Sequence, residues 1–407
     1  MALLSDNPMF EAFGTRALFW ATYGGADFGE CLTTAERVGA GTVDDWHREW
    51  TATADRVAGI GDESAARRHP VSAREAYLRA STYYRTAYFP LFGEPVDPRL
   101  TAAAEREGEV FRRAAALLDP PVQALEIPFE GGSLPAYLVT VDDSGRPRPT
   151  MLHTNGYDSN VQEMYLAHAP AAARRGYNCL LFDGPGQGRA LVRDGLRMRP
   201  DWENVVRPVV DFALGLPEVD PERLVLCGWS FGGFLAPRAA AFEPRVAALV
   251  ADPGQWDPGE PLRGALPLSD EDRAAFPDVD PAALAPMEAW LQGPDVDPLL
   301  RWRLLGRGQW VHGAPSLYDY LASMFAYTLS DVADRIACPA AITMAEGDPI
   351  AAGAPKLFDA LPNERKALIR FTAAEGTGGH CEGQARTLYH QRTFDWLDET
   401  LGPPTAV

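Results

Sequence analysis

Bulky apolar and aromatic side chains recur at intervals of three and four residues in the first quarter of the chain. Residues 75–85 (EAYLRASTYYR) show this pattern, and residues 102–117 are rich in alanine, glutamate and arginine. Both features are typical of helices that bury one face. Two prolines follow Asp119, and proline ends a helix. We therefore predict an N-terminal helical arm over residues 1–118.

Beyond the arm, the pattern changes to short apolar or alternating runs, which are typical of β-strands. We expect strands at residues 122–129, 134–141, 149–154, 177–183, 223–227, 246–252, 339–344 and 366–371. Helical patterns separate most of these strands, so they predict an α/β fold with a mostly parallel sheet and helices on both faces. The first two strands, split by Gly131, Gly132 and Ser133, are expected to form an antiparallel hairpin.

A long segment separates the sixth and seventh predicted strands. Residues 253–335 are rich in proline, tryptophan and acidic side chains, and the segment is too long for an ordinary loop. We interpret it as an inserted lid. Residues 119–252 and 336–407 then form the core domain.

Charge and composition narrow the classes of partner. The chain carries 56 acidic against 37 basic residues, a formal net charge of −19. Such a surface repels phosphate backbones and anionic lipid headgroups, so we expect neither nucleic acid nor a membrane as partner. The first residues lack a basic segment followed by an apolar one, and no run approaches the roughly 18 apolar residues of a spanning helix. These features predict a cytoplasmic protein.

No cofactor or metal is predicted. The 5 cysteines are scattered without C-x-x-C spacing, so they indicate neither a disulfide framework nor a zinc site, and we expect most of them to be reduced and buried. Residues 183–188 (DGPGQG) follow an apolar strand, but their glycines do not fit the G-x-G-x-x-G of a dinucleotide-binding loop. We interpret this turn as shaping the sheet edge near the pocket.

The sharpest chemical signal is a serine between a strand and a helix. Residues 224–227 are apolar, and Ser230 lies between Gly228 and Gly232 in a G-x-S-x-G motif. In a nucleophile elbow, a strained turn projects the serine above the carboxyl edge of the sheet, and the glycines leave room where the backbone folds back. We predict that Ser230 is a nucleophile.

A serine hydroxyl needs a base, and the base needs an acid that orients it. With a G-x-S-x-G elbow, the expected order along the chain is serine, acid, histidine. His380 lies in a glycine-rich loop after the last predicted strand, and Asp348 follows the strand at 339–344. We expect His380 to be the general base and Asp348 its partner, with Glu346 and Glu375 as competing acids.

The other histidines are predicted to pack or to lie on the surface. His153, at the end of a strand, is expected to form a hydrogen bond that shapes the following loop. The rest lie in the N-terminal helices (His47, His69), on later helices (His168, His390) and in the lid (His312).

The tetrahedral oxyanion of acyl transfer needs donors that are fixed in advance, usually two backbone N–H groups. One candidate is the N–H of Phe231, which begins the helix after the serine. The other is the N–H of Tyr157, after the strand at 149–154, with Gly156 as the alternative. The Tyr157 side chain could also form a wall of the pocket.

With these residues, the chain resembles the branch of the α/β-hydrolases that includes 2,6-dihydroxypseudooxynicotine hydrolase and the fungal hydrolases that shorten polyketide naphthopyrones. The resemblance runs from about residue 65 to the C-terminus. It rests on residues 73–85, 155–159 and 183–188, the Ser230 elbow, Asp348, and residues 379–381. It implies the α/β-hydrolase fold, with an N-terminal helical domain and an inserted lid.

Members of this branch cleave a carbon–carbon bond beside a ketone on an electron-rich ring, so the resemblance implies that Ser230 attacks the ketone carbonyl. It also implies an additional acid after the strand that follows the elbow. Glu260 is the nearest positional match, and Asp257 is the alternative. The lid between Glu260 and Asp348 is longer than in the branch pattern.

Three functions remain at this point. Hydrolysis of an aromatic or polyketide-like ketone fits the aromatic residues of the lid. An ester or amide hydrolase, or an acyltransferase, would use the same triad. A ligand-binding protein that has lost turnover is the third, and the intact serine, aspartate and histidine set argues against it. We expect a small apolar or aromatic substrate, and a homodimer is left open.

Overall fold

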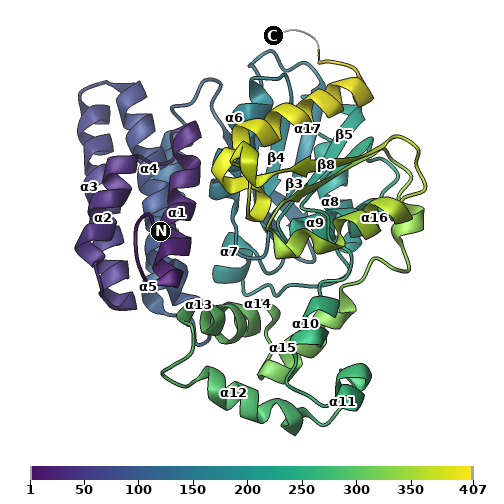
Figure 1. Cartoon of the computed structure of the whole chain (residues 1–407). Helices are drawn as coiled ribbons and strands as arrows, with labels where there is room; N and C mark the ends of the chain where they lie inside the picture. The colour runs from purple at the N-terminus through teal and green to yellow at the C-terminus, as the bar shows by residue number, and fades with distance from the viewer. Residues whose placement is uncertain (1, 405–407) are drawn as a thin grey trace.

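The computed structural model describes residues 2–404 and contains an eight-stranded sheet (Figure 1). The strands are β1 (Gln123–Phe129), β2 (Gly132–Val139), β3 (Arg148–Thr154), β4 (Asn178–Phe182), β5 (Val219–Trp229), β6 (Ala248–Asp252), β7 (Ala340–Ala345) and β8 (Lys366–Phe371). Their order across the sheet is β1-β2-β4-β3-β5-β6-β7-β8. Strand β2 is antiparallel to both of its neighbours, and the pairs from β4 to β8 are parallel. The eight predicted strands and the mostly parallel sheet are confirmed.

Helices cover both faces of this sheet. They are α6 (Val161–Ala173), α7 (Gly188–Val192), α8 (Glu203–Ala213), α9 (Gly232–Ala240), α16 (Ala354–Ala360) and α17 (Arg386–Leu401). Leu152 and Leu226 pack in one hydrophobic core with side chains of α8 and α9. Their neighbours Met151 and Val225 pack in the other core, with α6 and α17. Successive strand residues point to opposite faces, so the apolar runs of the central strands supply both cores.

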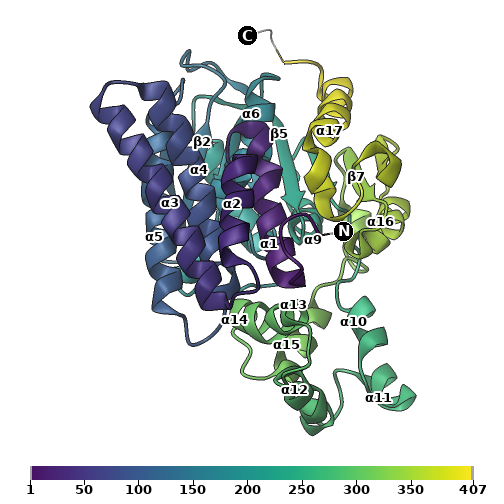
Figure 2. The same ribbon diagram turned by 60° about the vertical axis from the view of Figure 1, so that its left-hand side comes forward.

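The arm consists of five helices that form a bundle beside the core (Figure 2). They are α1 (Pro8–Phe19), α2 (Phe28–Val38), α3 (Val43–Ala66), α4 (Pro70–Tyr88) and α5 (Pro98–Ala115). Buried aromatic residues of the arm share the core that contains α6 and α17. Trp20, for example, lies with its ring centroid 6.0 Å from that of Trp229, next to the serine. The arm therefore packs against the elbow itself.

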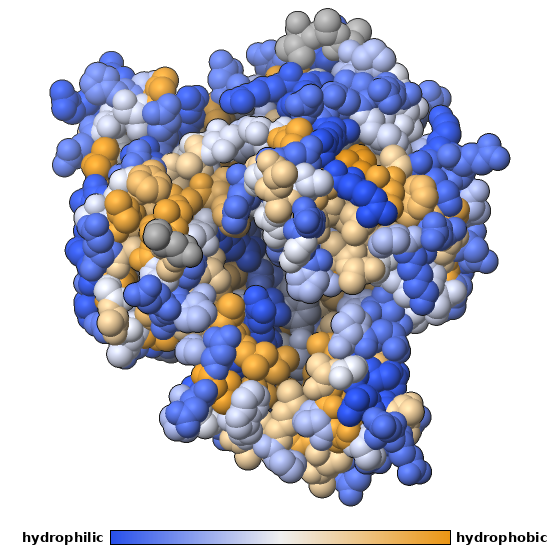
Figure 3. Space-filling model, in the orientation of Figure 1, coloured by the Kyte–Doolittle hydropathy of each residue, from blue (hydrophilic) through white to orange (hydrophobic). Residues whose placement is uncertain are grey.

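Short helices make up the segment that was interpreted as a lid, and they project from the core on the side opposite to α17 (Figure 1). They are α10 (Glu260–Ala265), α11 (Asp270–Ala275), α12 (Ala285–Leu291), α13 (Pro298–Arg301), a π-helix (Trp302–Gly308), α14 (Gln309–His312) and α15 (Leu317–Ser323). The lid contacts the arm, because Trp302 Nε1 donates a hydrogen bond to the carbonyl of Phe89 at 3.0 Å. Figure 3 shows a hollow where arm, core and lid meet, with hydrophilic residues in its depth.

The cysteines form no disulfide bonds. All five cysteines are free; Cys338 is partly exposed and the other four are buried. Within residues 2–404, no helix is both long enough and apolar enough to cross a membrane.

Candidate active site

Ser230 occupies the sharp turn between β5 and α9. Its φ is +56°, a left-handed backbone conformation that residues other than glycine rarely adopt. A Cβ atom on Gly228 would lie 1.9 Å from the carbonyl oxygen of Gly232, and one on Gly232 would lie 2.4 Å from that of Thr154. Both positions therefore require glycine, as the elbow motif predicts. The Ser230 N–H donates to the carbonyl of Asp252, at the end of β6, at 2.6 Å.

The structure brings Ser230, His380 and Asp348 into one hydrogen-bonded chain. Ser230 Oγ lies 2.7 Å from His380 Nε2, and His380 Nδ1 lies 2.9 Å from Asp348 Oδ2. The Asp348 side chain is only 1% exposed, whereas that of His380 is 39% exposed. Asp348, at one end of these three residues, is thus shielded from water, whereas the histidine between Asp348 and Ser230 is accessible.

Asp348, rather than either competing glutamate, lies beside the histidine. Glu346 accepts a hydrogen bond from the N–H of Ala373, and Glu375 pairs with Arg392. Burial alone would raise the pKa of Asp348, but the hydrogen bond from His380 and that from the N–H of Ile350 outweigh it and leave the pKa lowered. Asp348 is therefore an ionised acceptor that can orient the imidazole and stabilise its protonated form.

The loop that carries the histidine is held in an unusual conformation. Cys381 and Glu382 both have positive φ, 53° and 47°. Arg386, at the start of α17, donates to the carbonyl of Cys381 at 2.9 Å and pairs with the carboxylate of Asp252 at 2.8 Å. This buried ion pair fixes the His380 loop to β6 and so to the elbow.

The loop after β3 lies directly against Ser230. A Cβ on Gly156 would be 2.7 Å from the Cβ of Ser230. The Gly156 N–H donates to Ser159 Oγ at 2.8 Å, so it is not free to bind a substrate. Among the described residues, by contrast, the N–H groups of Phe231 and Tyr157 have no hydrogen-bond acceptor. Both N–H groups of the predicted Phe231–Tyr157 pair are thus free to donate, and their role as oxyanion donors stays a prediction.

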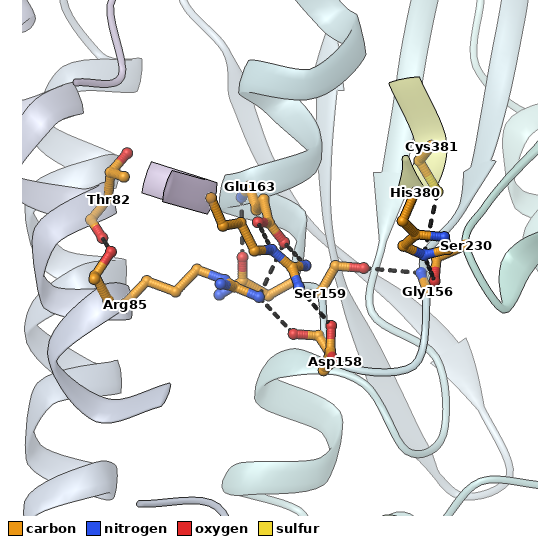
Figure 4. Close-up of polar contacts among 12 residues, drawn as sticks. Thr82, Arg85, Gly156, Asp158, Ser159, Glu163, Ser230, His380 and Cys381 are labelled. Atoms are coloured by element: carbon orange, nitrogen blue, oxygen red, sulfur yellow. Dashed lines mark hydrogen bonds and ion pairs between the residues drawn. The ribbon is translucent and has the colours of Figure 1, made fainter. Parts of the chain in front are cut away.

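Partly buried ion pairs hold this loop, and we call Asp158, Glu163, Arg16, Arg85 and Arg307 the loop clamp. Figure 4 shows three of these residues, Asp158, Glu163 and Arg85. Asp158 Oδ1 lies 2.8 Å from Arg16 Nη1, and its Oδ2 lies 2.7 Å from Arg307 Nη1. Glu163 pairs with Arg16 at 2.7 Å and with Arg85 at 2.9 Å. Arg85 also donates to the carbonyl of Asp158 at 2.5 Å.

The loop clamp joins all three parts of the molecule. Arg16 and Arg85 belong to arm helices α1 and α4, Arg307 belongs to the π-helix of the lid, and Asp158 directly follows Tyr157. Burial opposes ionisation of Asp158, but the two arginines Arg16 and Arg307 hold the pKa of its carboxyl below its usual value. No local pattern predicts that Asp158 joins the arm to the lid, because its arginine partners are scattered along the chain.

His153 was predicted to form a hydrogen bond that shapes the following loop. Its side chain is completely buried, and the side chain of Asn155, in that loop, is a polar group that interacts with it. The ring also packs against His168 on α6, with ring centroids 4.0 Å apart. Burial, and then the charge of Arg386, lowers the pKa of His153 to about 3 although Asn155 opposes the shift, so the ring is neutral.

His153, His168 and Cys227 form the one group that could hold a metal among the described residues, with ligand atoms within 4.8 Å of one another. The guanidinium of Arg386 lies 3.3 Å from a nitrogen of His168. A cation at this place would be repelled by that buried positive charge, so the group does not suit a metal. His168 and His390 are buried packing residues, whereas His47 is half-buried and His69 is exposed.

The two candidates for an additional acid differ in environment. The Glu260 side chain is 55% exposed and pairs with Arg263 at 3.2 Å. It has no hydrogen bond or ion pair with the triad in the described part of the chain. Asp257 is half-buried, and burial raises the pKa of its carboxyl although the N–H groups of Gly259 and Glu260 oppose the shift.

Comparisons with known proteins agree with this architecture. The family described as "Esterase FrsA-like" matches residues 36–255, and the "Alpha/beta hydrolase family" matches residues 151–385. Hydrolase LUC6 of Fusarium sp is 34% identical over 417 residues, and the 20-hydroxy-prefusarin hydrolase FUS2 of Gibberella moniliformis is 33% identical over 418 residues. Each alignment covers 95% of this chain and 95% of the relative. The similarity thus extends further into the arm than residue 65.

A solved structure shows the same fold. The crystal structure of 2,6-dihydroxy-pseudo-oxynicotine hydrolase superimposes with a TM-score of 0.73 at 24% identity, and the match covers 94% of this chain and 95% of that chain. The resemblance to this branch inferred from the elbow, the acid and the histidine loop is confirmed. The chain therefore belongs to the α/β-hydrolase family, in the branch that includes these fungal hydrolases.

Proposed function

We propose that the protein is a serine hydrolase that works through an acyl-enzyme. The observation that carries this proposal is the chain from Ser230 through His380 to Asp348, with hydrogen bonds of 2.7 and 2.9 Å, beside two unpaired backbone N–H groups. Nucleophile, base, orienting acid and oxyanion donors are the parts that acyl transfer requires.

The geometry supports a stepwise mechanism. The Ser230 hydroxyl gives its proton to His380 Nε2 while its oxygen forms a bond to the substrate carbonyl carbon. The carbonyl oxygen becomes an oxyanion, which accepts hydrogen bonds from the N–H groups of Phe231 and Tyr157. Protonated His380 then gives its proton to the leaving group, and the acyl group stays on Ser230. A water molecule, deprotonated by His380, releases the carboxylic acid and restores the serine.

For the substrate, we propose an aromatic or polyketide-like ketone, which is cleaved at the carbon–carbon bond next to its carbonyl group. The similarity to a 20-hydroxy-prefusarin hydrolase supports this choice. A group of aromatic side chains next to the serine supports it too, because the ring centroid of Phe231 lies 5.2 Å from those of both Tyr157 and Tyr327. In this reaction the leaving carbon takes the electron pair of the broken bond and a proton.

A second candidate, an ester hydrolase, is favoured by the match to the FrsA-like esterases over residues 36–255. An alkoxide leaving group needs only the proton of His380, whereas a carbon leaving group gains from further stabilisation. The same triad serves both reactions. Measured rates on an aryl ketone and on an activated ester would decide between them.

The experiment that tests the serine mechanism is labelling with a fluorophosphonate. Ser230→Ala should abolish labelling and turnover, and His380→Ala should cost about as much, because the residues of a triad act as a unit. Ser133→Ala, in the β1–β2 hairpin, is the matched control and should be labelled like the wild type. Labelling of Ser230→Ala at the wild-type rate would refute the assignment.

A further inference from the structure

A carboxyl group lies buried in the loop of His380, two residues after the histidine. The Glu382 side chain is completely buried, and no N–H or O–H group among the described residues donates to either of its oxygens. Its carboxyl group shares a hydrogen bond with that of Asp252, the last residue of β6. Two carboxylates cannot form such a bond, because neither has a proton to donate. One of the two groups is therefore protonated.

The charges around Glu382 assign the proton to it. Asp252 already accepts from Arg386 Nη1 at 2.8 Å and from the hydroxyl of Thr343 at 3.0 Å. Asp348 is a second carboxylate nearby, whereas Arg386, 3.8 Å away, is the cation that faces Glu382. Burial and the charge of Asp252 raise the pKa of Glu382 well above its usual value. Glu382 is thus the protonated partner and donates to the Asp252 carboxylate.

The other titratable groups that face Glu382 carry no charge. They are the thiol of Cys381, next to it in the loop, and the hydroxyl of Tyr389 on α17. Burial raises the pKa of both, so each keeps its proton. Neither group offsets the negative charge that Glu382 would carry as a carboxylate.

The shared proton connects the loop of His380 to the strand that holds the serine. The carbonyl of Asp252 accepts from the Ser230 N–H at 2.6 Å, while its carboxylate accepts from Glu382. Cys381 and Glu382 have left-handed φ values of 53° and 47°. Side chains persist in this conformation only where their surroundings hold them. Without the hydrogen bond to Asp252, we expect the loop to relax and to carry His380 away from Ser230.

We propose that Glu382 is a positioning residue, which donates a hydrogen bond as a neutral acid to Asp252 and thereby holds His380 at Ser230. This inference rests on the proposed serine mechanism and adds to it a group that does not touch the substrate. When Glu382 loses its proton to the solvent at alkaline pH, two carboxylates face each other, and their repulsion breaks the contact. Serine reactivity should then fall, unless position 382 carries a donor that does not titrate.

Two substitutions of similar size separate the hydrogen bond from the packing. Glu382→Gln keeps an N–H donor that does not titrate, and Glu382→Met fills the same space without a donor. Fluorophosphonate labelling from about pH 6 to pH 10 gives the binding constant of the probe and the first-order rate constant of its reaction with Ser230.

The two variants should differ in the first-order rate constant and not in probe binding. Glu382→Met should lower this rate constant about 100-fold, since a misplacement of about 1 Å in a reacting group costs that much. Glu382→Gln should stay within about threefold of the wild type near pH 7 and keep its rate at alkaline pH, where the wild-type rate falls. Glu399→Gln is the matched control, because it removes a carboxylate from an exposed position of α17, and it should follow the wild type at every pH.

Infrared spectroscopy tests the shared proton without any reaction. The difference spectrum between the wild type and Glu382→Gln at neutral pH should contain the C=O stretch of one protonated carboxyl group. Absence of this band would overturn the inference, and so would coincident pH profiles of these two proteins. Both tests stand if Glu382→Met does not fold.

A folded Glu382→Met protein that reacts at the wild-type rate would also overturn the positioning role. A wild type that does not react with the probe at any pH would instead refute the serine mechanism. The infrared band would then decide alone whether Glu382 and Asp252 share a proton.

Discussion

From the loop clamp we predict that loss of the Asp158 charge lowers both stability and activity, although Asp158 does not touch the triad. Asp158→Asn keeps the shape of the side chain and removes its charge. Arg16 and Arg307 then face one neutral amide, and Glu163 remains as the only carboxylate of the clamp. The loop that presents the Tyr157 N–H loses its fixed position relative to Ser230.

Two magnitudes follow from this arrangement. Removal of one partner from a fully buried ion pair typically costs 3–5 kcal/mol. Asp158 and its two arginines are partly exposed, and the amide oxygen and Glu163 retain part of the interaction, so we expect a loss of about 1–2 kcal/mol in the free energy of unfolding. Loss of one oxyanion donor typically lowers kcat by about 100- to 1,000-fold. Because the loop is loosened rather than removed, we expect a decrease in kcat of roughly 100-fold.

The measurement is kcat on a p-nitrophenyl ester, with urea denaturation followed in parallel. Glu243→Gln is the matched control. Glu243 pairs with an arginine too, Arg245, at 2.6 Å. It precedes the amino end of β6, whereas the triad lies at the carboxyl ends of the strands. We expect it to destabilise the protein while kcat stays near the wild-type value. If Asp158→Asn lost stability but kept kcat within about threefold, the clamp would not position the oxyanion donor.

Three further predictions concern single acids. Asp348→Asn should lower kcat at least about 100-fold, and more than Glu346→Gln does; the reverse order in steady-state kinetics would show that Glu346 is the acid of the triad. Burial raises the pKa of Glu107 from 4.5 to about 7, so the folded protein holds this proton more tightly than the unfolded chain. This group makes stability fall as the pH rises from about 4.5 to 7, so Glu107→Gln should show a smaller decline in urea denaturation than the wild type, in which buried Asp183 also contributes; parallel curves for the two proteins would contradict it. Asp257→Asn should reduce aryl-ketone cleavage more than Glu260→Gln does, because Asp257 is half-buried and burial raises its pKa, whereas Glu260 is exposed and paired with Arg263. The opposite ranking would restore Glu260 as the additional acid.

Most of the fold, and the residues Ser230, Asp348 and His380, could be predicted from local sequence patterns. The apolar runs that form β3 to β7 were readable because buried parallel strands need continuous hydrophobic residues. The elbow was readable because it is a short motif in which a Cβ on Gly228 would collide with Gly232, four residues further on. Asp348 and His380 followed from their places after strands, since the carboxyl ends of parallel strands meet at one edge.

The features that escaped prediction depend on contacts between distant segments. Arg307 and Asp158 are 149 positions apart, and neither arginine nor aspartate stands out in a chain rich in both. The contact of His153 with His168 on α6 likewise joins two distant segments.

The contact between the arm and Trp302 has a consequence for biosynthesis. The arm leaves the ribosome early, yet Phe13 and Phe89 pack on Trp302, with ring centroids 4.9 and 5.2 Å away. At translation rates of about 5–20 residues per second, these aromatic side chains wait on the order of ten seconds or more for their partner. During that time the nascent arm presents an apolar surface to chaperones and to other nascent chains. Soluble yield in a heterologous host should therefore respond to chaperone supply and to growth temperature.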